Sequence, residues 1–413
     1  MRIGIDARWI FPEISGVGRV TEKLIQHLGE TDRENTYLLF FSEAEQMARY
    51  ASRWEPYPNL EPIMVPWRIF SPGNQMRMPA FIRKQKLDIF HSTNYMLPLF
   101  LRKTAVISTI HDLIPLKFPH FTPRAKKTRF NYLFRILLSR CARQSDRIIT
   151  VSSHTRDDLI GDLGISGEKI AVVYNGIDDH YQPLGREDIQ TYLKEKLDLS
   201  PPYLLYVGRF DPYKNVVELI KAFSLFSRGR EDRPTLVLAG HLDPRYPEGP
   251  QTVKELEMED QVVFLNGVDE DDLIHLYNGA RGLILASLYE GFGLPPLEAM
   301  ACGTPVIVSD RGSLPEVVGD AGIIIDPDRE DSIAGAIGRL WDSETLRSEL
   351  REKGLRRAKE FSWEKTARET LRVYEELVGM GEWGDGTSRT GPTRPTGPTS
   401  PVSPIKKGPG AGS

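Results

Sequence analysis

Two glutamates stand eight residues apart in the segment YEGFGLPPLEAMACGTPVIVSD, residues 289–310. Glu290 follows an apolar run that predicts a strand, and Glu298 lies in the first turns of a helix that the proline pair begins. A carboxylate at a helix entrance can accept two hydrogen bonds from a vicinal diol, as acidic residues do with ribose. We therefore expect Glu298 to bind a ribose and Glu290, at the end of the strand, to accept hydroxyl protons from a sugar.

The glycines between these carboxylates indicate an anion. Gly291 and Gly293 leave backbone N–H groups at a helix entrance free to face phosphate oxygens. A second segment, VGRFDPYKN, residues 207–215, ends another predicted strand and adds Arg209 and Lys214. Two cations beside a glycine that permits close backbone approach make a site for a diphosphate. One such segment could be an ordinary loop with solvated charges, but two that agree favour the anion site.

A carboxylate pair that hydrolyses glycosidic bonds is the competing interpretation of Glu290 and Glu298. Such pairs stand about 5–9.5 Å apart. Eight residues of continuous helix would separate two residues by roughly 12 Å, and a hydrolase would leave the diphosphate-binding features without a use. A nucleotide-sugar site is therefore the stronger prediction.

Short apolar runs rich in β-branched residues predict the strands that position these loops. They form two series, from RIGIDA to IAVVYNG in the first half and from YLLYVGR to AGIIIDP in the second, separated by segments of helical period. Continuous apolar runs are typical of buried parallel strands. The sequence therefore predicts an α/β protein with two doubly wound, Rossmann-like domains that face each other across a cleft. In such sheets ligands bind beyond the carboxyl ends of the strands.

Length and composition agree with two domains and exclude other classes. The chain has 413 residues and a net charge of −4, without the basic excess of a nucleic-acid-binding protein. Its two cysteines, Cys141 and Cys302, are too few for a disulfide scaffold or a cysteine metal site and fit a reducing cytoplasm. MRIGIDARWI at the start predicts a strand rather than a signal peptide, and no apolar run approaches 18 residues. We expect a cytoplasmic protein, at most peripheral on the inner face of the plasma membrane.

Four segments resemble, in order, the motifs of the family 4 retaining glycosyltransferases, which have the GT-B fold. EGFGLPPLE matches the E-x7-E motif, VGRFDPYKN the Arg and Lys loop, FLNGVDEDDLIHLYNGA the nucleobase segment and FSWEKTARETLRVYEE the C-terminal helix. The resemblance covers about residues 1–378. It implies an acceptor-side domain at 1–178, a donor-side domain at 179–361 and a helix at 362–379 that crosses back to the first domain. Residues 380–413 are rich in Gly, Pro, Ser and Thr, and we expect a disordered tail.

The resemblance also implies roles for individual residues. His111, at the end of AVISTIHD, would lie beside the transferred sugar, and with Glu290 it forms the predicted catalytic pair. Two glycines in a predicted loop before a helix would approach the donor phosphates, with Arg19 as a further candidate. The predicted donor-binding set is Gly16, Gly18, Arg209, Lys214, Val268, Phe292, Gly293, Leu294 and Glu298.

Other polar residues at predicted strand ends have less defined roles. His91 and Asn94, in IFHSTNYMLP, are secondary site candidates. Asp112 can orient its loop or touch the ligand. Ser152 and Ser153 predict the N-cap of the next helix.

Neither a metal nor a cofactor is expected, apart from the nucleotide sugar as co-substrate. Asp326 and Asp328 spell the D-x-D of metal-dependent transferases of another fold, but a turn followed by a helix cap explains them better. Transferases of the GT-B type offset the charge of the leaving diphosphate with cations and helix dipoles.

The implied reaction moves a hexose from a nucleotide diphosphate sugar to a hydroxyl of a saccharide or lipid-linked saccharide, with retention at the anomeric carbon. HDLIPLKFP and IDARWIFPEISGVGR are similar to bacterial mannosyltransferases of polysaccharide assembly, which favours GDP-mannose. The motifs contain no evident covalent nucleophile, so the family's front-face route, in which the departing phosphate accepts the acceptor's proton, fits. A nucleotide-sugar epimerase of similar fold and a non-catalytic nucleotide-sugar binding protein are the alternatives.

A basic segment lies in the first half, at residues 122–147. It carries eight arginines and lysines against one acid, Asp146. Apolar residues recur there at three- and four-residue intervals and predict a helix with one apolar face: Phe130, Phe134, Leu137, Leu138 and Cys141. That face can pack on the sheet and leave solvated cations outside. Alternatively, the cations rest on an anionic membrane leaflet and present the cleft to a lipid-linked saccharide.

Overall fold

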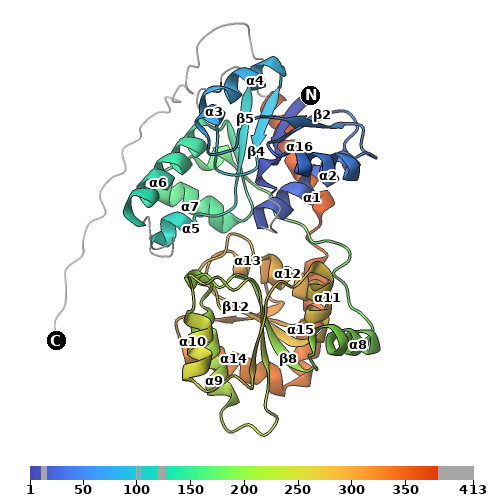
Figure 1. Cartoon of the computed structure of the whole chain (residues 1–413), viewed down its shortest axis with the longest axis vertical. Helices are drawn as coiled ribbons and strands as arrows, with labels where there is room; N and C mark the ends of the chain where they lie inside the picture. Colours follow the sequence, from blue (N-terminus) through green and yellow to red (C-terminus); the bar gives the residue numbers. More distant parts are fainter. Residues whose placement is uncertain (11–15, 99–100, 102–103, 120–126, 380–413) are drawn as a thin grey trace, which may run out of the picture.

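The computed structural model describes residues 1–379 except 11–15, 99–100, 102–103 and 120–126, and the backbone alone of 127–133. These residues form two α/β domains, one above the other in Figure 1, and each domain is built on one sheet. All the paired strands run parallel. The predicted fold class is confirmed.

The sheet of the first domain has seven strands in the order β3-β2-β1-β4-β5-β6-β7. Their bounds are β1 (Arg2–Asp6), β2 (Thr36–Phe41), β3 (Leu60–Met64), β4 (Ile89–Ser92), β5 (Ala105–Ile110), β6 (Arg147–Thr150) and β7 (Ile170–Val172). Five of the six residues of β2 and all six of β5 are buried, because helices cover both faces of the sheet. The strand order reverses between β1 and β4, and ligands bind beyond such a switch point.

Helices pack on both faces of this sheet. They are α1 (Gly16–Thr31), α2 (Ala44–Arg53), α3 (Pro72–Met76), α4 (Met78–Lys84), α5 (Ile114–Lys117), α6 (Lys127–Gln144) and α7 (Ser153–Leu163), with short 3-10 turns at Ala7–Trp9 and Gly167–Lys169. One cluster packs Leu24 of α1 against Ile5 of β1. A second cluster packs Ile82 of α4 against Phe90 of β4, so the core lies in two layers.

The second domain repeats the plan with six strands in the order β10-β9-β8-β11-β12-β13. The strands are β8 (Tyr203–Val207), β9 (Leu236–Ala239), β10 (Val262–Leu265), β11 (Ala280–Leu285), β12 (Val306–Ser309) and β13 (Gly322–Ile325). The helices are α8 (Arg186–Leu197), α9 (Val216–Ser227), α10 (Glu248–Glu255), α11 (Glu270–Gly279), α12 (Leu294–Ala301), α13 (Leu314–Val318), α14 (Glu330–Asp342) and α15 (Glu344–Ala358). A single cluster of buried side chains forms the core of this domain. Its switch point lies between β8 and β11.

The last described helix, α16 (Trp363–Gly379), belongs to the core of the first domain. Ala367 and Tyr374 lie in one cluster with Ile5 and Leu24, and Thr366 Oγ1 donates to the carbonyl oxygen of Tyr174 at 2.7 Å. Figure 1 shows this helix, in orange, in the upper domain beside the blue elements that begin the chain. The predicted return of the C-terminal helix is confirmed.

Gly16 and Gly18 lie in the first turn of α1 rather than in a loop before the helix, so that expectation was wrong. The helix already includes this turn. Thr21 Oγ1 donates to the carbonyl oxygen of Val17, four residues earlier, at 2.9 Å. The domain limits at 178 and 361 stay predictions. The tail at 380–413 lies outside the described residues. None of the described helices has the length and apolarity needed to cross a bilayer.

Candidate functional site

The loops after β8 and β11 meet beyond the switch point of the second sheet. The backbone N–H of Leu288 donates to the carbonyl oxygen of Tyr213 at 2.8 Å and joins the two loops. Each loop directly follows a central strand, and the carboxyl ends of neighbouring parallel strands share one edge. The fold therefore places the Arg and Lys loop beside the loop that carries Glu290.

Lys214 and Glu290 form an ion pair at this junction. Lys214 Nζ lies 2.7 Å from Oε1 and 2.9 Å from Oε2 of Glu290, and Ser287 Oγ donates to Oε1 at 2.7 Å. The two side chains are 15% and 11% exposed. Charges shielded from water attract each other more strongly than surface charges do. Lys214 comes from a short 3-10 turn, Pro212–Lys214, just before α9.

Glycines shape the turn between Glu290 and α12. Gly293 is the N-cap residue of the helix and has a φ of 113°, which residues with side chains rarely adopt. A Cβ at Gly291 would lie 2.2 Å from the carbonyl oxygen of His111 in the first domain. This turn therefore needs glycine both for its own conformation and for the close approach of the other domain.

Glu298 is buried in α12 and is bound from both domains. Tyr277 OH donates to its Oε2 at 2.6 Å, and Nη1 of Arg19, in α1, donates to its Oε1 at 2.7 Å. Arg19 also lies 2.9 Å from Asp178 and 3.1 Å from Glu270. Burial works to lower the pKa of Arg19, but the Glu298 carboxylate and its other partners raise it overall, so the guanidinium is charged. The carboxylate predicted to bind a ribose thus holds a cation from the first domain.

His111 directly follows β5 and is buried. Its Nε2 lies 2.9 Å from the carbonyl oxygen of Thr93, which places the ring proton on Nε2. Burial lowers the pKa of His111 to about 4, so the imidazole is neutral near pH 7. A neutral ring that already donates from Nε2 can offer a ligand only the acceptor Nδ1.

Asp112 connects the first domain electrostatically to Glu290. Burial, and to a lesser degree the Glu290 carboxylate, raises the pKa of Asp112 to about 6. Its Oδ1 accepts from the backbone N–H of Ile114 at 3.0 Å. Of the two roles that the sequence left open, the structure supports the one in which Asp112 orients its own loop.

The remaining predicted donor-binding residues of the second domain differ in exposure. Arg209 is the most open, because its side chain is 66% exposed and its Nε bonds to Asp211 at 2.8 Å. Phe292 is buried in the core of the domain, and Val268 and Leu294 pack against that core while partly buried. These three can give a ligand shape and backbone contacts but no charge.

Two secondary candidates, His91 and Asn94, have structural partners. The His91 Nδ1 lies 2.7 Å from Tyr374 OH of α16, and its Nε2 lies 2.8 Å from Thr109 Oγ1. Burial lowers the pKa of His91 to about 3, so the ring is neutral. Asn94 Oδ1 accepts from the backbone N–H of Tyr95 at 2.8 Å. His91 therefore holds the C-terminal helix on the first domain.

Asp326 and Asp328 bind Arg311, whose Nη2 lies 3.3 Å and 2.9 Å from them. Asp326 Oδ1 also accepts from the backbone N–H of Asp328 at 3.1 Å, so the expected turn is present. The expected helix cap was wrong, because the N-cap of α14 is Arg329 and has no side-chain cap bond. The two carboxylates neutralise an arginine instead.

Among the described residues, Asp178, His180 and Glu270 form one group of three possible metal ligands, with ligand atoms within 4.8 Å of one another. Arg19 pairs with both of these carboxylates, and Lys23 Nζ lies 2.5 Å from Asp178. Because these cations neutralise the acids, we assign no metal there.

Sequence reasoning missed the contacts that join the domains beside the site. Glu316, in α13, accepts from the backbone N–H of Ser153 at 2.8 Å, at the start of α7. Ser152 Oγ donates to the carbonyl oxygen of Gly291 at 2.7 Å. Ser152 is also the N-cap of α7, which confirms that prediction. The partners lie 163 and 139 residues apart in the chain, and no local pattern signals such pairs.

Comparisons with known proteins agree with this arrangement. The model of Glycosyltransferase Family 4 matches residues 14–181, and the model of Glycosyl transferases group 1 matches residues 190–357. The chain is 29% identical over 377 residues to O-antigen chain mannosyltransferase B of Escherichia coli, covering 88% of this chain and 97% of that protein. It is 31% identical over 274 residues to the O-antigen chain mannosyltransferase RfbU of Salmonella typhimurium, covering 66% and 70%. The solved structure of HepE of Anabaena, in complex with UDP-glucose, has a TM-score of 0.71 at 18% identity, covering 91% of this chain and 100% of that one.

Proposed function

The chain belongs to glycosyltransferase family 4, and we propose that it transfers a mannosyl group from a nucleotide diphosphate sugar to a hydroxyl of a saccharide or lipid-linked saccharide, with retention. One observation carries the proposal: the shielded Lys214–Glu290 pair beyond the switch point of the second sheet, with the backbone of His111 against the adjoining turn. A cation suited to a diphosphate and a carboxylate suited to sugar hydroxyls stand together there.

Different site residues act on the sugar and on the nucleoside diphosphate of the donor. Lys214 and Arg209 stabilise the charge that grows on the leaving diphosphate, and Glu290 holds hydroxyls of the transferred sugar. Glu298 accepts the ribose hydroxyls after Arg19 has left its carboxylate. The bond from the anomeric carbon to the diphosphate oxygen breaks, the acceptor oxygen bonds to that carbon on the same face, and the departing phosphate takes the acceptor's proton.

The names of the relatives support the sugar and the product class. Both are O-antigen chain mannosyltransferases, which favours mannose over other hexoses and a cell-surface polysaccharide as the product. GDP-mannose is accordingly the proposed donor. The UDP-glucose complex of HepE supports only the general class of nucleotide sugar.

We also propose that the enzyme works in the cytoplasm on the inner face of the membrane, with the basic segment at 122–147 as the contact. Residues 122–126 of this segment lie outside the described residues, and α6 forms most of the rest. Phe134 and Leu138 of α6 are buried against the first sheet, whereas Arg135, Ile136 and Arg140 are exposed. Each cation near an anionic surface contributes about 1 kcal/mol. Arg135→Glu/Arg140→Glu should reduce co-sedimentation with anionic vesicles but not with neutral ones, and equal binding of variant and wild type to anionic vesicles would contradict this contact.

A donor panel tests the reaction. GDP-mannose, UDP-glucose and ADP-glucose are compared by thermal shift, since a ligand of the folded state adds RT ln(1 + [L]/Kd) to stability. GDP-mannose should raise the Tm most, and incubation with an oligomannose acceptor should give an α-linked product by NMR. Conversion without an acceptor, with exchange of a sugar proton into solvent, would identify an epimerase. Binding without turnover would identify a non-catalytic binding protein.

A further inference from the structure

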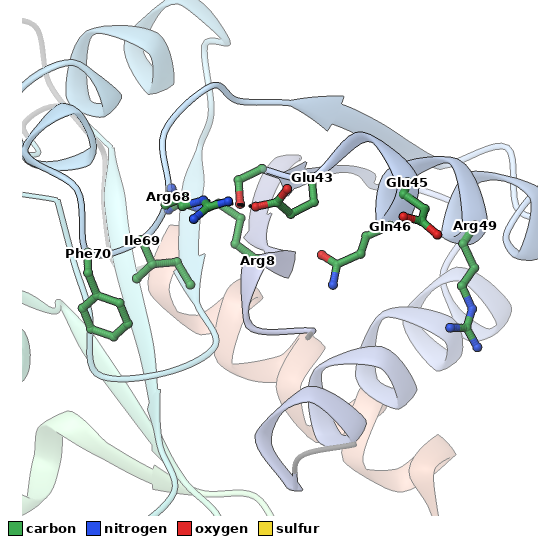
Figure 2. Close-up of a pocket in the computed structure, with 9 residues that line it drawn as sticks. Arg8, Glu43, Glu45, Gln46, Arg49, Arg68, Ile69 and Phe70 are labelled. Atoms are coloured by element: carbon green, nitrogen blue, oxygen red, sulfur yellow. Dashed lines mark ion pairs between the residues drawn. The ribbon is translucent and has the colours of Figure 1, made fainter. Parts of the chain in front are cut away.

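A cavity of about 500 Å³ lies at the carboxyl edge of the first sheet, apart from the Lys214–Glu290 pair. Its lining comes from segments that follow three neighbouring strands. Arg8 follows β1, the start of α2 follows β2, and Ile69 and Phe70 follow β3. Figure 2 shows these side chains around the hollow between α2 and the segment at Arg68–Phe70.

The cavity shares its edge of the sheet with the predicted catalytic histidine. His111 follows β5, and β2 lies three positions from β5 in the strand order. Adjacent strands are spaced by about 4.8 Å, so the segment after β2 begins roughly 14 Å from the end of β5. An acceptor chain whose terminal hydroxyl reacts near His111 can therefore extend along this edge to the cavity.

The floor of the cavity is rigid and electrically compensated. Arg8 is 3% exposed. Its Nε and Nη2 each lie 2.7 Å from Asp6, and its Nη1 donates to the carbonyl oxygen of Trp67 at 2.8 Å and to Asn74 Oδ1 at 2.9 Å. A guanidinium held by three partners cannot turn toward an anion.

The charges of the walls also cancel. Glu43 pairs with Arg68 at 3.2 Å, and Glu45 and Arg49 add one charge of each sign on α2. A ligand with a net charge gains little from such a wall. A neutral polyol gains more, because its hydroxyls both donate and accept, and carboxylates and guanidinium groups supply the complementary atoms.

Gln46 and Phe70 offer the two kinds of contact that a sugar ring makes. Among the residues that the structure describes, the Gln46 amide has no hydrogen-bond partner, and Figure 2 shows it pointing from α2 into the hollow. Phe70 is 64% exposed, and its ring meets Trp9 at 5.8 Å in a T-shaped contact. Ile69 beside it is buried. Figure 2 shows the two side chains on opposite sides of Arg8, so the aromatic ring can bind the apolar C–H face of one sugar unit while the amide binds the hydroxyls of another.

We propose that this cavity is a distal acceptor subsite that holds uncharged sugar units of the growing chain, upstream of the unit whose hydroxyl reacts. The proposal rests on the proposed function, because it assigns the acceptor of the same reaction a second place on the enzyme. It predicts that the enzyme favours longer acceptors and that the preference resides in Phe70 and Gln46.

The test compares two acceptors of different length. Transfer from GDP-mannose to an α-linked mannose disaccharide and tetrasaccharide is measured for wild type, Phe70→Ala and Gln46→Ala. Met76→Ala is the matched control, since Met76 is 77% exposed and does not line the cavity. Phe70→Ala should raise KM for the tetrasaccharide about tenfold, and Gln46→Ala about threefold, with kcat and the disaccharide KM unchanged. Equal effects on both acceptors, or no effect on either, would overturn the subsite.

Direct binding separates this inference from the proposed function. If the wild type transfers mannose to no acceptor, the proposed function fails, and calorimetric titration with the tetrasaccharide alone then decides the subsite. Weaker binding by Phe70→Ala than by wild type supports it, and equal binding or none overturns it. Titration with inorganic phosphate is the third arm, because phosphate binding that Arg68→Ala or Arg49→Ala abolishes would make the cavity an anion site instead.

Discussion

Glu290 and Glu298 belong to one short motif, yet the first domain meets them with opposite charges. Across the boundary Glu290 faces Asp112, a carboxyl whose pKa it helps to raise, whereas Glu298 is bound by the Arg19 guanidinium at 2.7 Å. Their partners within the second domain differ as well. Glu290 has a cation, Lys214, and Glu298 has the phenol of Tyr277.

The difference assigns separate tasks to the two carboxylates. The charge of Glu290 is balanced within its own domain, so we infer that this half of the site keeps its form when the domains separate. The cation at Glu298 comes from the other domain. With the proposed ribose contact at Glu298, nucleotide binding and the domain contact at Arg19 compete for one carboxylate, and each weakens the other by the same factor.

The largest effect is expected when the cation of Glu290 is removed. Lys214→Ala should lower kcat/KM about 100-fold or more, because the diphosphate loses its cation and a buried carboxylate loses its partner. Steady-state transfer from the donor measures this. Lys221→Ala is the control, since Lys221 pairs with Glu218 on the outer side of α9 and is 40% exposed. Wild-type rates for Lys214→Ala would contradict the proposed role of Lys214 in binding the diphosphate.

Exchange of each carboxylate for an amide separates their roles. Glu290→Gln should lower kcat about 100-fold with little change in the affinity for free nucleoside diphosphate, since its proposed partner is the sugar. Glu298→Gln should instead weaken nucleoside diphosphate binding about tenfold, since its proposed partner is the ribose. Titration calorimetry with GDP and steady-state kinetics measure both. The reverse pattern would show that the two roles are exchanged.

The burial of Asp112, together with the nearby Glu290 carboxylate, should appear as a pH dependence of the free energy of unfolding. The pKa of Asp112 is about 6 in the folded protein against 3.8 ordinarily, so its contribution is complete below pH 3.8 and is lost as pH rises through 6. Asp112→Asn keeps an acceptor for Ile114 without the charge. It should exceed the wild type in stability by about 3 kcal/mol at pH 8, and most of the difference should be lost near pH 4. Urea unfolding at both pH values checks this, and a difference independent of pH would contradict it.

Removal of the cation that binds Glu298 should have a smaller effect, and it should strengthen nucleotide binding rather than weaken it. Arg19→Ala should tighten GDP binding about threefold, because the ribose no longer displaces a guanidinium. Lys23→Ala is the matched control, since Lys23 pairs with Asp178 in the same network. Calorimetric Kd values decide the outcome. Weaker binding by Arg19→Ala would mean that Arg19 is itself a donor ligand, and the two carboxylates would then not compete as described.

No effect is expected from excess chelator. A divalent ion between Asp112 and Glu290 would bind both carboxylates and remove their repulsion. The first domain would then no longer meet Glu290 and Glu298 with opposite charges. Activity measured with and without EDTA should be equal. Loss of activity in EDTA that manganese or magnesium restores would place a metal in the site.

The fold was predictable because its signal is local. Each buried parallel strand is a continuous apolar run, as in TYLLFF and AVISTI, and the glycines and charges that follow such runs mark one edge of a sheet. The proximity of Lys214 to Glu290 follows from the same reasoning, since both follow central strands. Once two neighbouring strands are assigned, their loops must meet.

The contacts between domains could not be predicted in this way. Arg19 and Glu298 are 279 residues apart, and their contact depends on how one sheet faces another. His91 looked like a site candidate because a polar residue at a strand end normally meets ligand. Its partner, Tyr374, arrives on a helix that follows the whole second domain. The predicted helix cap at Asp326 and Asp328 was wrong for a similar reason. Arg311, which lies outside the turn, binds both carboxylates.

The path of α16 sets the order in which the protein can be completed during synthesis. Domains generally fold from the N-terminus as the ribosome releases them. Here Ala367, Tyr374 and Leu377 supply part of the core of the first domain, so its apolar face between α1 and the sheet stays uncovered until nearly the last described residue has emerged. The second domain has its whole sheet by Ile325 and α15 by Ala358. The domain that begins the chain is therefore the last to close, and residues 1–178 produced alone would lack part of one layer of their core.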